Sequence, residues 1–536
     1  MSRLHSWLIG SALLLGGPAL AQTTRTYDLN FNAQNYRSVT TDVNGRVVRY
    51  RAYERVVYVR RPQDTTYQSM NIYVPEEYFE GGSIGTYTAQ TAPIFFPNQI
   101  GGYMQAEPGT PGLQPQRGAQ PPAGAGGTTQ PSTATGTSAP AAPGGAAQPP
   151  ASAPAQSATA QGSPNAILVA LSRGYVVASP GARGRTTRNA QGEYIGKAPA
   201  AILDLKAAVR YLRYNDEAMP GNAERIISNG TSAGGAMSAL LGATGNNLNF
   251  GPSLTAMGAA DTRDDIYAVS SYCPITDLEH ADAAYEWQFG GVNDYQRLQI
   301  SRDTDFNIQR TLVPGTLTAE EIAVSNELKP LFAPYLNSLR LRNGEQPLTL
   351  DANGNGPFKN YMASLLQASA QSALDAGQDL SGLTWLTVSN GRVTGVDFDA
   401  YARTAGRMKV PPAFDGLSLE NAENEEFGSA TVNARHFTAF SQERSKVEGT
   451  TADAQAIRLM NPMNYIGLSG TQASKYWRIR VGTADRDTSL AVSAMLATRL
   501  TNTGHDVDYF LPWNVPHSGD YDLEQLFAWM DKVVAE

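Results

Sequence analysis

The sequence predicts an α/β fold in which helices cover both faces of a mostly parallel sheet. Short apolar runs of strand length alternate with helical patterns over residues 92–272 and again over residues 476–534. Parallel strands need crossover helices of this kind, and both faces of such a sheet are buried. A hydrophobic content of 41% in 536 residues provides the material for a core of this size. Both blocks are therefore assigned to one core domain.

Each block has a regular order of elements. The first has strand patterns at 92–97, 174–179, 225–229 and 266–272, and helical patterns at 165–173, 198–214 and 236–241. The second has strand patterns at 476–481 and 506–511, and helical patterns at 490–500 and 523–534. The apolar residues of the 198–214 helix recur on one face, as expected for a helix that packs on a sheet.

Two segments interrupt the alternation. Residues 277–460 contain polar helical stretches and turn-rich pieces. We assign them to a large inserted lid domain, which divides the core into residues 22–276 and 461–536. Residues 105–164 hold 12 of the 32 prolines and no aromatic residue. Such a composition cannot bury enough apolar surface to offset its ordering entropy, so a disordered loop within the core domain is expected.

The N-terminus and the overall charge indicate location and partners. Residues 1–21 combine Arg3, a short apolar run and a small-residue pattern ending at Ala21, which is typical of a signal peptide cleaved before Gln22. We therefore expect a secreted or periplasmic protein, and no later apolar run has the length of a membrane span. The net charge of −8 argues against a nucleic-acid partner, which would require a basic face. The only cysteine, Cys273, is interpreted as a small buried residue at a strand end.

The segment Gly230-Thr231-Ser232-Ala233-Gly234 matches the pattern G-x-S-x-G. A strand pattern precedes it and a helical pattern follows it, which is the context of a nucleophile elbow. A serine on this tight turn is lifted clear of the backbone, and the glycines avoid clashes there. The motif predicts an α/β-hydrolase core with Ser232 as its nucleophile.

A serine nucleophile needs a base, and a base needs a partner that orients it. Of five histidines, His517 follows the strand pattern at 506–511 and so lies at the carboxyl edge of the sheet, as does Ser232. Asp485 follows the strand pattern at 476–481 at the same edge. The chain order Ser, Asp, His is that of α/β-hydrolases, and Ser232, Asp485 and His517 are the predicted triad. Asp487 is an alternative for the acid, but Asp485 lies closer to the strand end.

Catalysis also needs donors for the oxyanion. The backbone N–H of Ala233, directly after the nucleophile, is the first predicted donor. The second is expected from the loop at Gly102 and Tyr103, which follows the strand pattern at 92–97. No His, Cys or carboxylate residues have the spacing of metal ligands, so neither a metal nor another cofactor is expected.

On these motifs the sequence resembles bacterial tannases that lack a cysteine pair beside the serine and histidine. The resemblance extends over most of the chain outside residues 1–30 and 105–164. Its markers are Gly230–Met237, Ser271–Asp277, Ala283–Trp287, Lys409 with Pro411 and Pro412, Glu423 with Asn424, Phe427 with Gly428, Asp485, Asp487 and His517. Thr231 and Pro516 occupy the positions of the cysteine pair found in another tannase and feruloyl esterase group, to which the chain does not belong.

The resemblance implies a galloyl ester or tannin as the small-molecule substrate. It also implies that Asp487, Lys409 and Glu423 bind the hydroxyls of the galloyl ring. A trihydroxy ring offers three donors, and carboxylates accept from such donors well. The residues alone leave Lys409 and Glu423 open as a surface charge or a structural ion pair.

Three other functions fit parts of this pattern. A feruloyl-type or general aryl esterase would use the same triad without Asp487, Lys409 and Glu423. A peptidase of the prolyl oligopeptidase type is disfavoured because too few residues precede the core and no repeat is visible. A non-catalytic hydrolase fold that binds polyphenols or glycans is disfavoured because the three triad residues occur in order.

Overall fold

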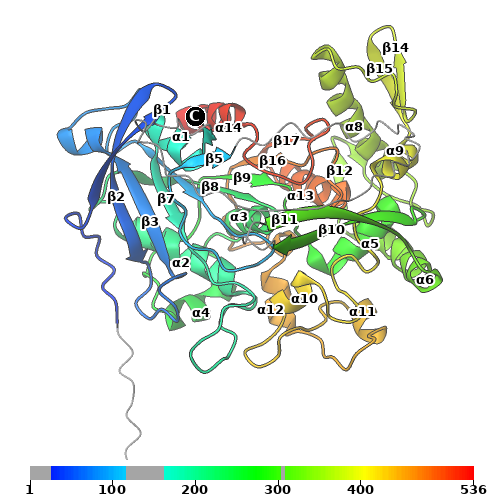
Figure 1. The fold of residues 1–536 in the computed structure, drawn as a ribbon, viewed down its shortest axis with the longest axis horizontal. Helices are drawn as coiled ribbons and strands as arrows, with labels where there is room; N and C mark the ends of the chain where they lie inside the picture. The colour runs from blue at the N-terminus through cyan, green and yellow to red at the C-terminus, as the bar shows by residue number, and fades with distance from the viewer. Residues whose placement is uncertain (1–25, 116–161, 303–307) are drawn as a thin grey trace, which may run out of the picture.

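The computed structural model describes residues 26–115, 162–302 and 308–536. Its main feature is a nine-stranded sheet in the order β1-β2-β3-β7-β4-β8-β9-β16-β17 (Figure 1). From β7 to β17 every neighbouring pair of strands is parallel. These parallel strands are β7 (Val176–Pro180), β4 (Pro93–Pro97), β8 (Asn222–Thr231), β9 (Ala268–Tyr272), β16 (Tyr476–Arg480) and β17 (Asp506–Phe510). The predicted α/β-hydrolase class is confirmed.

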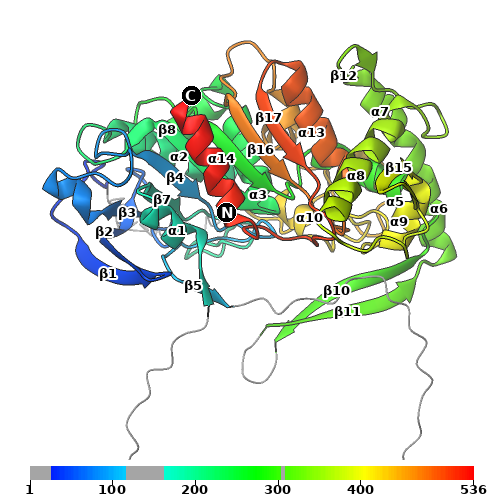
Figure 2. The same ribbon diagram turned by 90° about the horizontal axis from the view of Figure 1, so that it is seen from above.

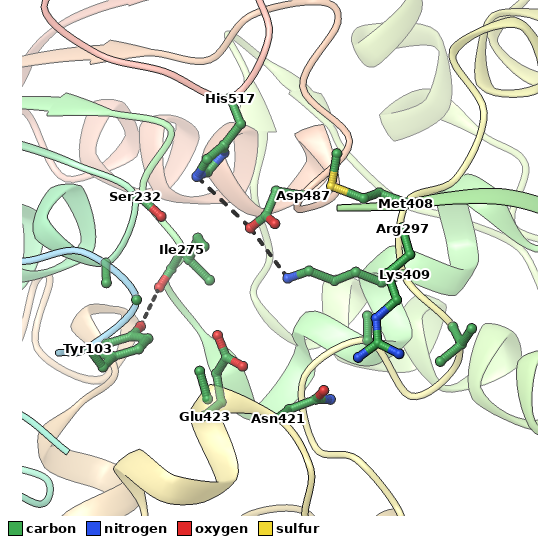
Figure 3. A pocket seen from close by; sticks show the side chains of 15 residues that line it. Tyr103, Ser232, Ile275, Arg297, Met408, Lys409, Asn421, Glu423, Asp487 and His517 are labelled. Carbon is green, nitrogen blue, oxygen red and sulfur yellow. Dashed lines mark hydrogen bonds and ion pairs between the residues drawn. The ribbon is translucent and has the colours of Figure 1, made fainter. Parts of the chain in front are cut away.

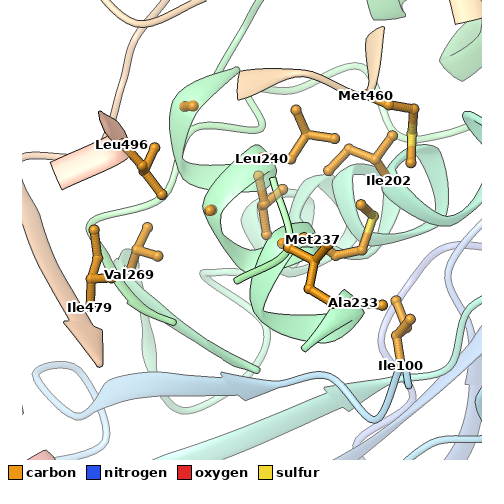
Figure 4. Close-up of a cluster of buried hydrophobic side chains, with 14 of the residues drawn as sticks. Ile100, Ile202, Ala233, Met237, Leu240, Val269, Met460, Ile479 and Leu496 are labelled. Carbon is orange, nitrogen blue, oxygen red and sulfur yellow. The ribbon is translucent and has the colours of Figure 1, made fainter. Parts of the chain in front are cut away.

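Helices cover both faces of the sheet because the strands are apolar on both sides. On β4, Ile94 and Phe96 pack in one buried cluster and Phe95 packs in the other. The first face carries α2 (Ala200–Tyr214), α3 (Ala233–Ala243) and α13 (Leu490–Asn502), and the second carries α1 (Ala166–Ser172) and α14 (Leu523–Ala535). Figure 4 shows the first cluster, in which Leu240 of α3 lies between Val269 of β9 and Ile202 of α2.

Three strands at one edge of the sheet were not among the predicted elements. They are β1 (Arg37–Val43), β2 (Arg46–Val57) and β3 (Ser69–Pro75). They pair antiparallel with one another, and β3 pairs antiparallel with β7. Strands β1 and β2 expose polar or charged side chains at several positions, such as Thr40, Arg49 and Glu54, and their pattern is therefore weaker than that of a strand buried on both faces. A short helical turn, η1 (Glu76–Glu80), follows β3.

The segment between β9 and β16 is mainly helical. Its helices are α5 (Leu278–Phe289), α6 (Ala319–Leu328), α7 (Phe332–Ser338), α8 (Pro357–Asp375), α9 (Phe398–Ala405), α10 (Ala422–Glu426), α11 (Ala439–Glu443) and α12 (Ala454–Leu459). Helices α6, α8 and α9 lie at the end of the molecule opposite to β1 and β2 (Figures 1 and 2). Short two-stranded sheets join β12 (Arg342–Asn343) to β13 (Gln346–Pro347) and β14 (Leu386–Ser389) to β15 (Arg392–Val396).

A long hairpin in this segment was also not predicted. Strands β10 (Asp294–Arg302) and β11 (Ile308–Thr316) pair antiparallel and extend away from the body of the molecule (Figure 2). Their polar composition gives little strand signal, because both faces carry charged or amide side chains. The remaining helical pieces are η2 (Leu248–Phe250), α4 (Gly251–Ala256), η3 (Lys329–Leu331) and η4 (Pro462–Asn464).

The predicted disordered loop at residues 105–164 wrongly included residues at both of its ends. Residues 105–115 lie against the core, where the amide of Asn71 donates to Gly109 O and Gly109 N donates to Ser179 Oγ. Strands β5 (Leu113–Pro115) and β6 (Gly162–Pro164) pair with each other. Hydrogen bonds to buried polar side chains hold these pieces, which a composition argument based on apolar burial misses. Residues 116–161, like the predicted signal peptide, lie outside the described residues. Among the described helices, none combines the length and the hydropathy that crossing a membrane requires.

Candidate active site

Ser232 lies on the turn between β8 and α3, with backbone angles φ 60° and ψ −125°. This strained conformation is the geometry of a nucleophile elbow. The flanking glycines are sterically required: a Cβ on Gly230 would overlap the carbonyl oxygen of Gly234, and a Cβ on Gly234 would lie 2.5 Å from Ile100 O. The predicted strand, turn and helix therefore exist, and they present Ser232 in a pocket.

His517 and Asp485 meet at the same edge of the sheet. Nδ1 of His517 lies 2.9 Å from Oδ2 of Asp485, whose carboxylate is fully buried. The loop that carries His517 is fastened to two core strands, since the Asn229 amide donates to Asp520 and the Tyr272 hydroxyl donates to Asp522. The sheet thus fixes both partners of the pair independently of any ligand.

The other ring nitrogen of His517 faces the pocket. Within the described residues no hydrogen bond joins it to Ser232 Oγ, and catalytic hydrogen bonds often tighten only when substrate is bound. Nε2 lies 3.9 Å from Sγ of Cys273, which follows β9 and is buried as predicted. Burial raises the pKa of the Cys273 thiol. The thiol therefore stays neutral beside the Asp485–His517 pair.

Cys273, Asp485 and His517 also bring three possible metal-ligand atoms within 4.8 Å of one another in the described part of the chain. No spacing in the sequence indicated this group, because the three residues follow three different strands. Since Nδ1 of His517 is already bonded to Asp485, the arrangement is that of a hydrolase pair beside a thiol.

The predicted oxyanion donors line the same pocket as Ser232. Gly102 and Tyr103 have φ values of 54° and 56°, and neither N–H meets a backbone acceptor within the described residues. Arg185 holds this loop in place, because its backbone N–H donates to Tyr103 O and its side-chain Nε donates to Gly102 O. Ala233 begins α3 and is fully buried at the pocket wall.

Asp487, Lys409 and Glu423 also converge on this pocket, although they come from three separate segments (Figure 3). Lys409 Nζ lies 3.3 Å from Asp487 Oδ2 and 4.0 Å from the centre of the Phe414 ring. Glu423, on α10, is buried on the opposite side of the pocket. Asp487 Oδ2 also lies 4.0 Å from Nε2 of His517.

The charges of these groups follow from burial and from their neighbours. Burial opposes ionisation of Asp487, but Lys409 and His517 outweigh it and lower the pKa of Asp487. Burial likewise opposes the cationic form of Lys409, but Asp487 and Glu423 raise its pKa overall. Burial raises the pKa of Glu423 despite the nearby Lys409. The pocket therefore contains a carboxylate that stays ionised (Asp487), a cation that stays charged (Lys409) and a carboxyl group that protonates more readily (Glu423).

The pocket has a volume of about 340 Å³, which fits a single aromatic ring with its ester group. Several lining residues were missed by the sequence analysis: Ile275, Arg297, Met408, Val410, Ala413, Asn421 and Ala422. Three of them flank a predicted residue directly, namely Met408 and Val410 beside Lys409 and Ala422 beside Glu423, and that proximity could have indicated them. Arg297 lies on the hairpin strand β10, for which the sequence carried no signal.

Known proteins resemble this chain in sequence and in structure. A family model described as BD-FAE matches residues 154–305. The crystal structure of Fusobacterium nucleatum tannase is 47% identical, covers 95% of this chain and 100% of its own, and has a TM-score of 0.83. A tannase from Lactobacillus plantarum is 42% identical, with 95% and 100% coverage and a TM-score of 0.82. A tannin acyl hydrolase in complex with ethyl gallate is 43% identical, with 94% and 99% coverage and a TM-score of 0.79. No curated protein matches the chain.

The parallel sheet and the serine elbow define an α/β-hydrolase, and the chain is a carboxylic ester hydrolase. At this identity over nearly its whole length, it belongs to the tannase family. The resemblance predicted from the sequence motifs is confirmed, including the type without a cysteine pair, since Cys273 is the only cysteine.

Proposed function

We propose that the protein hydrolyses galloyl esters of tannins and releases gallic acid through a galloyl–enzyme intermediate. The observation that carries this proposal is the position of Asp487, which contacts Lys409 on one side and faces His517 on the other. A ring hydroxyl bound by Asp487 would place the rest of the acyl group within reach of Ser232. Two relatives are described as complexes with ethyl gallate and with 3,4-dihydroxybenzoate, both of which carry ring hydroxyls.

The first half of the reaction forms the acyl-enzyme. His517 removes the proton of Ser232 as Oγ attacks the ester carbonyl, and Asp485 holds the imidazole and stabilises its cation. The N–H groups of Ala233 and of Gly102 or Tyr103 donate to the oxyanion of the tetrahedral intermediate. His517 then gives the proton to the departing alcohol oxygen, and the galloyl group remains esterified to Ser232.

The second half repeats these steps with water as the nucleophile. His517 takes a proton from water, the hydroxide adds to the acyl carbonyl, and Ser232 leaves with that proton. Gallic acid is released and the serine is regenerated. The pair Asp487 and Lys409, with Glu423 opposite, would bind the three ring hydroxyls throughout, since these contacts do not involve the reacting carbonyl.

The direct test compares methyl gallate with methyl ferulate, whose acyl group has one free ring hydroxyl and a longer spacer. We expect rapid acid release from methyl gallate and little from methyl ferulate. Ser232→Ala should reduce turnover by a factor on the order of 10⁶. Equal cleavage of both esters would leave a general aryl esterase as the function. Cleavage of neither ester, with no change in Ser232→Ala, would favour the non-catalytic alternative.

We also propose that the protein is exported. The support is the composition of residues 1–21, with Arg3, an apolar run and small residues up to Ala21. Tannins are large polar molecules that an exported enzyme meets outside the cytoplasm. Mass spectrometry of the protein recovered from its native cells should give an N-terminus at Gln22, and an intact Met1 or a cytoplasmic location would contradict export.

A further inference from the structure

The hydroxyl of Tyr285, on α5, makes three hydrogen bonds to the backbone of two pocket segments. It accepts from Met408 N at 3.0 Å and from Lys409 N at 3.1 Å, and it donates to Arg486 O at 3.0 Å. Tyr285 is fully buried. Burial raises the pKa of Tyr285, although Arg407 and the two N–H donors oppose this, and the hydroxyl keeps the proton that it donates.

These three bonds join the two sides of the hydroxyl-binding end of the pocket. Arg486 stands between Asp485 and Asp487, and Lys409 extends from the other segment. The ion pair between Lys409 Nζ and Asp487 Oδ2, at 3.3 Å, joins the same two segments through their side chains. One buried oxygen atom therefore links the backbone positions of both charged groups.

The neighbouring residue on α5 holds the Lys409 segment a second time. Glu286 forms a fully buried ion pair with Arg407, and Arg407 Nε donates to Lys409 O at 2.9 Å. The backbone N–H of Lys409 is thus bonded to Tyr285 of α5, and its carbonyl is bonded to Arg407, which pairs with Glu286 of α5. Gln288, further along α5, accepts from Leu490 N, just beyond Asp487. The polar side of α5 consequently fixes the segments that supply Lys409 and Asp487.

We propose that Tyr285 is a positioning residue for recognition of the acyl ring, acting by setting the separation of Lys409 and Asp487. This inference rests on the proposed function, because it assumes that these two side chains bind the ring hydroxyls. Hydroxyl recognition depends steeply on geometry, since a hydrogen bond weakens once its distance or angle departs from the narrow optimum. The ester carbonyl lies at the other end of the acyl group. An acyl group without ring hydroxyls should therefore depend far less on Tyr285.

Tyr401 provides a matched control. It is also a buried tyrosine, on α9, and its hydroxyl donates to Thr483 O at 2.7 Å in the same segment that carries Asp485. Among the described residues it has no hydrogen bond to the Lys409 segment. Replacing either tyrosine by phenylalanine keeps the ring and its packing, but only Tyr285→Phe removes a hydrogen bond to the backbone of Lys409.

The experiment measures kcat and KM of wild type, Tyr285→Phe and Tyr401→Phe with methyl gallate and with p-nitrophenyl acetate. For Tyr285→Phe we expect kcat/KM for methyl gallate to fall on the order of tenfold, mainly through KM, because buried partners are left without their hydrogen bonds. The change with p-nitrophenyl acetate should stay within about twofold. The inhibition constant of gallic acid against p-nitrophenyl acetate should rise in parallel with KM. Tyr401→Phe should change the two esters by equal factors.

A double mutant tests whether Tyr285 acts through Lys409. In a Lys409→Met background, Tyr285→Phe should cost much less for methyl gallate than it does alone, since the side chain that it positions is gone. Full additivity would overturn the inference, as would an equal loss for both esters in the single variant.

The two hypotheses fail in different ways. A wild-type enzyme without preference for methyl gallate would overturn the proposed function. A wild-type preference that survives Tyr285→Phe unchanged would overturn this inference alone. The melting temperatures of the two Phe variants, compared with wild type, show whether both remain folded at the assay temperature.

Discussion

Oδ2 of Asp487 lies 4.0 Å from Nε2 of His517 and 3.3 Å from Nζ of Lys409. One carboxylate thus faces both the predicted catalytic base and the cation of the predicted hydroxyl-binding group. Burial lowers the pKa of His517, but the attraction of Asp485 and Asp487 outweighs this and raises it well above its usual value. If Asp487 binds a ring hydroxyl as proposed, substrate recognition and the protonation of His517 are coupled through this carboxylate.

The pH profile should reveal this coupling. A general base acts in its neutral form, so the raised pKa of His517 places the acid limb of kcat/KM at a higher pH than an isolated histidine would. Asp487→Asn removes one of the charges that favour the imidazolium, and the acid limb should move down by about one pH unit. p-Nitrophenyl acetate is the substrate for this measurement, because its acyl group has no hydroxyl for Asp487 to bind. Asp508→Asn, whose carboxylate pairs with Arg480 away from the pocket, should leave the profile unchanged.

Asp485→Asn tests which aspartate belongs to the triad. Its carboxylate holds Nδ1 of His517 at 2.9 Å, and an amide there would favour the wrong tautomer of the ring. We expect kcat to drop by about 10⁴ near neutral pH with both p-nitrophenyl acetate and methyl gallate. Asp487→Asn should cost far less with p-nitrophenyl acetate. The reverse ranking with that ester would assign the triad acid to Asp487.

Gly234→Ala should disable the elbow. The added Cβ would lie 2.5 Å from Ile100 O and 2.6 Å from Asn98 Oδ1, so α3 and the loop that follows β4 must move apart. We expect a lower melting temperature and loss of most activity. Gly251→Ala is the matched control, because Gly251 begins α4 with φ −53° and a Cβ there meets no atom within 4 Å. That variant should keep full activity, with stability equal to wild type or higher by about 0.4–1 kcal/mol. Equal damage in both variants would mean that the close approach at Gly234 is not what constrains it.

Glu426 should make stability fall as pH rises. Its carboxyl is fully buried on α10, and neither oxygen has a hydrogen-bond partner within the described residues. Burial raises the pKa of Glu426 to about 8, against about 4.3 in an unfolded chain. Between these values the folded state holds a proton that the unfolded state releases, so the free energy of unfolding decreases with increasing pH.

Glu426→Gln removes this dependence. The decrease in melting temperature from pH 5 to pH 7.5 should be smaller in the variant than in wild type by a few degrees, on the order expected for about 3 kcal/mol. Glu443→Gln, at the exposed end of α11, should retain the wild-type decrease. An identical pH dependence in all three proteins would show that Glu426 is ionised in the folded state.

Local patterns in the sequence determined the core and the predicted triad. Strands β4 and β7 are buried along their whole length and are mainly apolar, and β8 and β9 carry the buried apolar pairs Ile226–Ile227 and Ala268–Val269, which mark them as strands. Ser232 is indicated by a motif whose glycines are sterically necessary. Asp485 and His517 follow from the rule that parallel strands end at a common edge. Strands β1 and β2 were not predicted because they are half exposed. The ordered ends of the 105–164 segment were not predicted because hydrogen bonds, rather than apolar burial, hold them.

Only the tertiary structure decided how the pocket is completed. Lys409, Glu423 and Arg297 lie in segments that share no sequence pattern, and their distances to Asp487 and His517 depend on how α5 and α10 pack on the core. The three bonds of Tyr285 and the approach of Cys273 to His517 likewise join residues more than a hundred positions apart. Sequence periodicity reports the burial of a single element. Contacts between elements depend on side-chain packing and on buried polar groups finding partners, and these are properties of the folded chain as a whole.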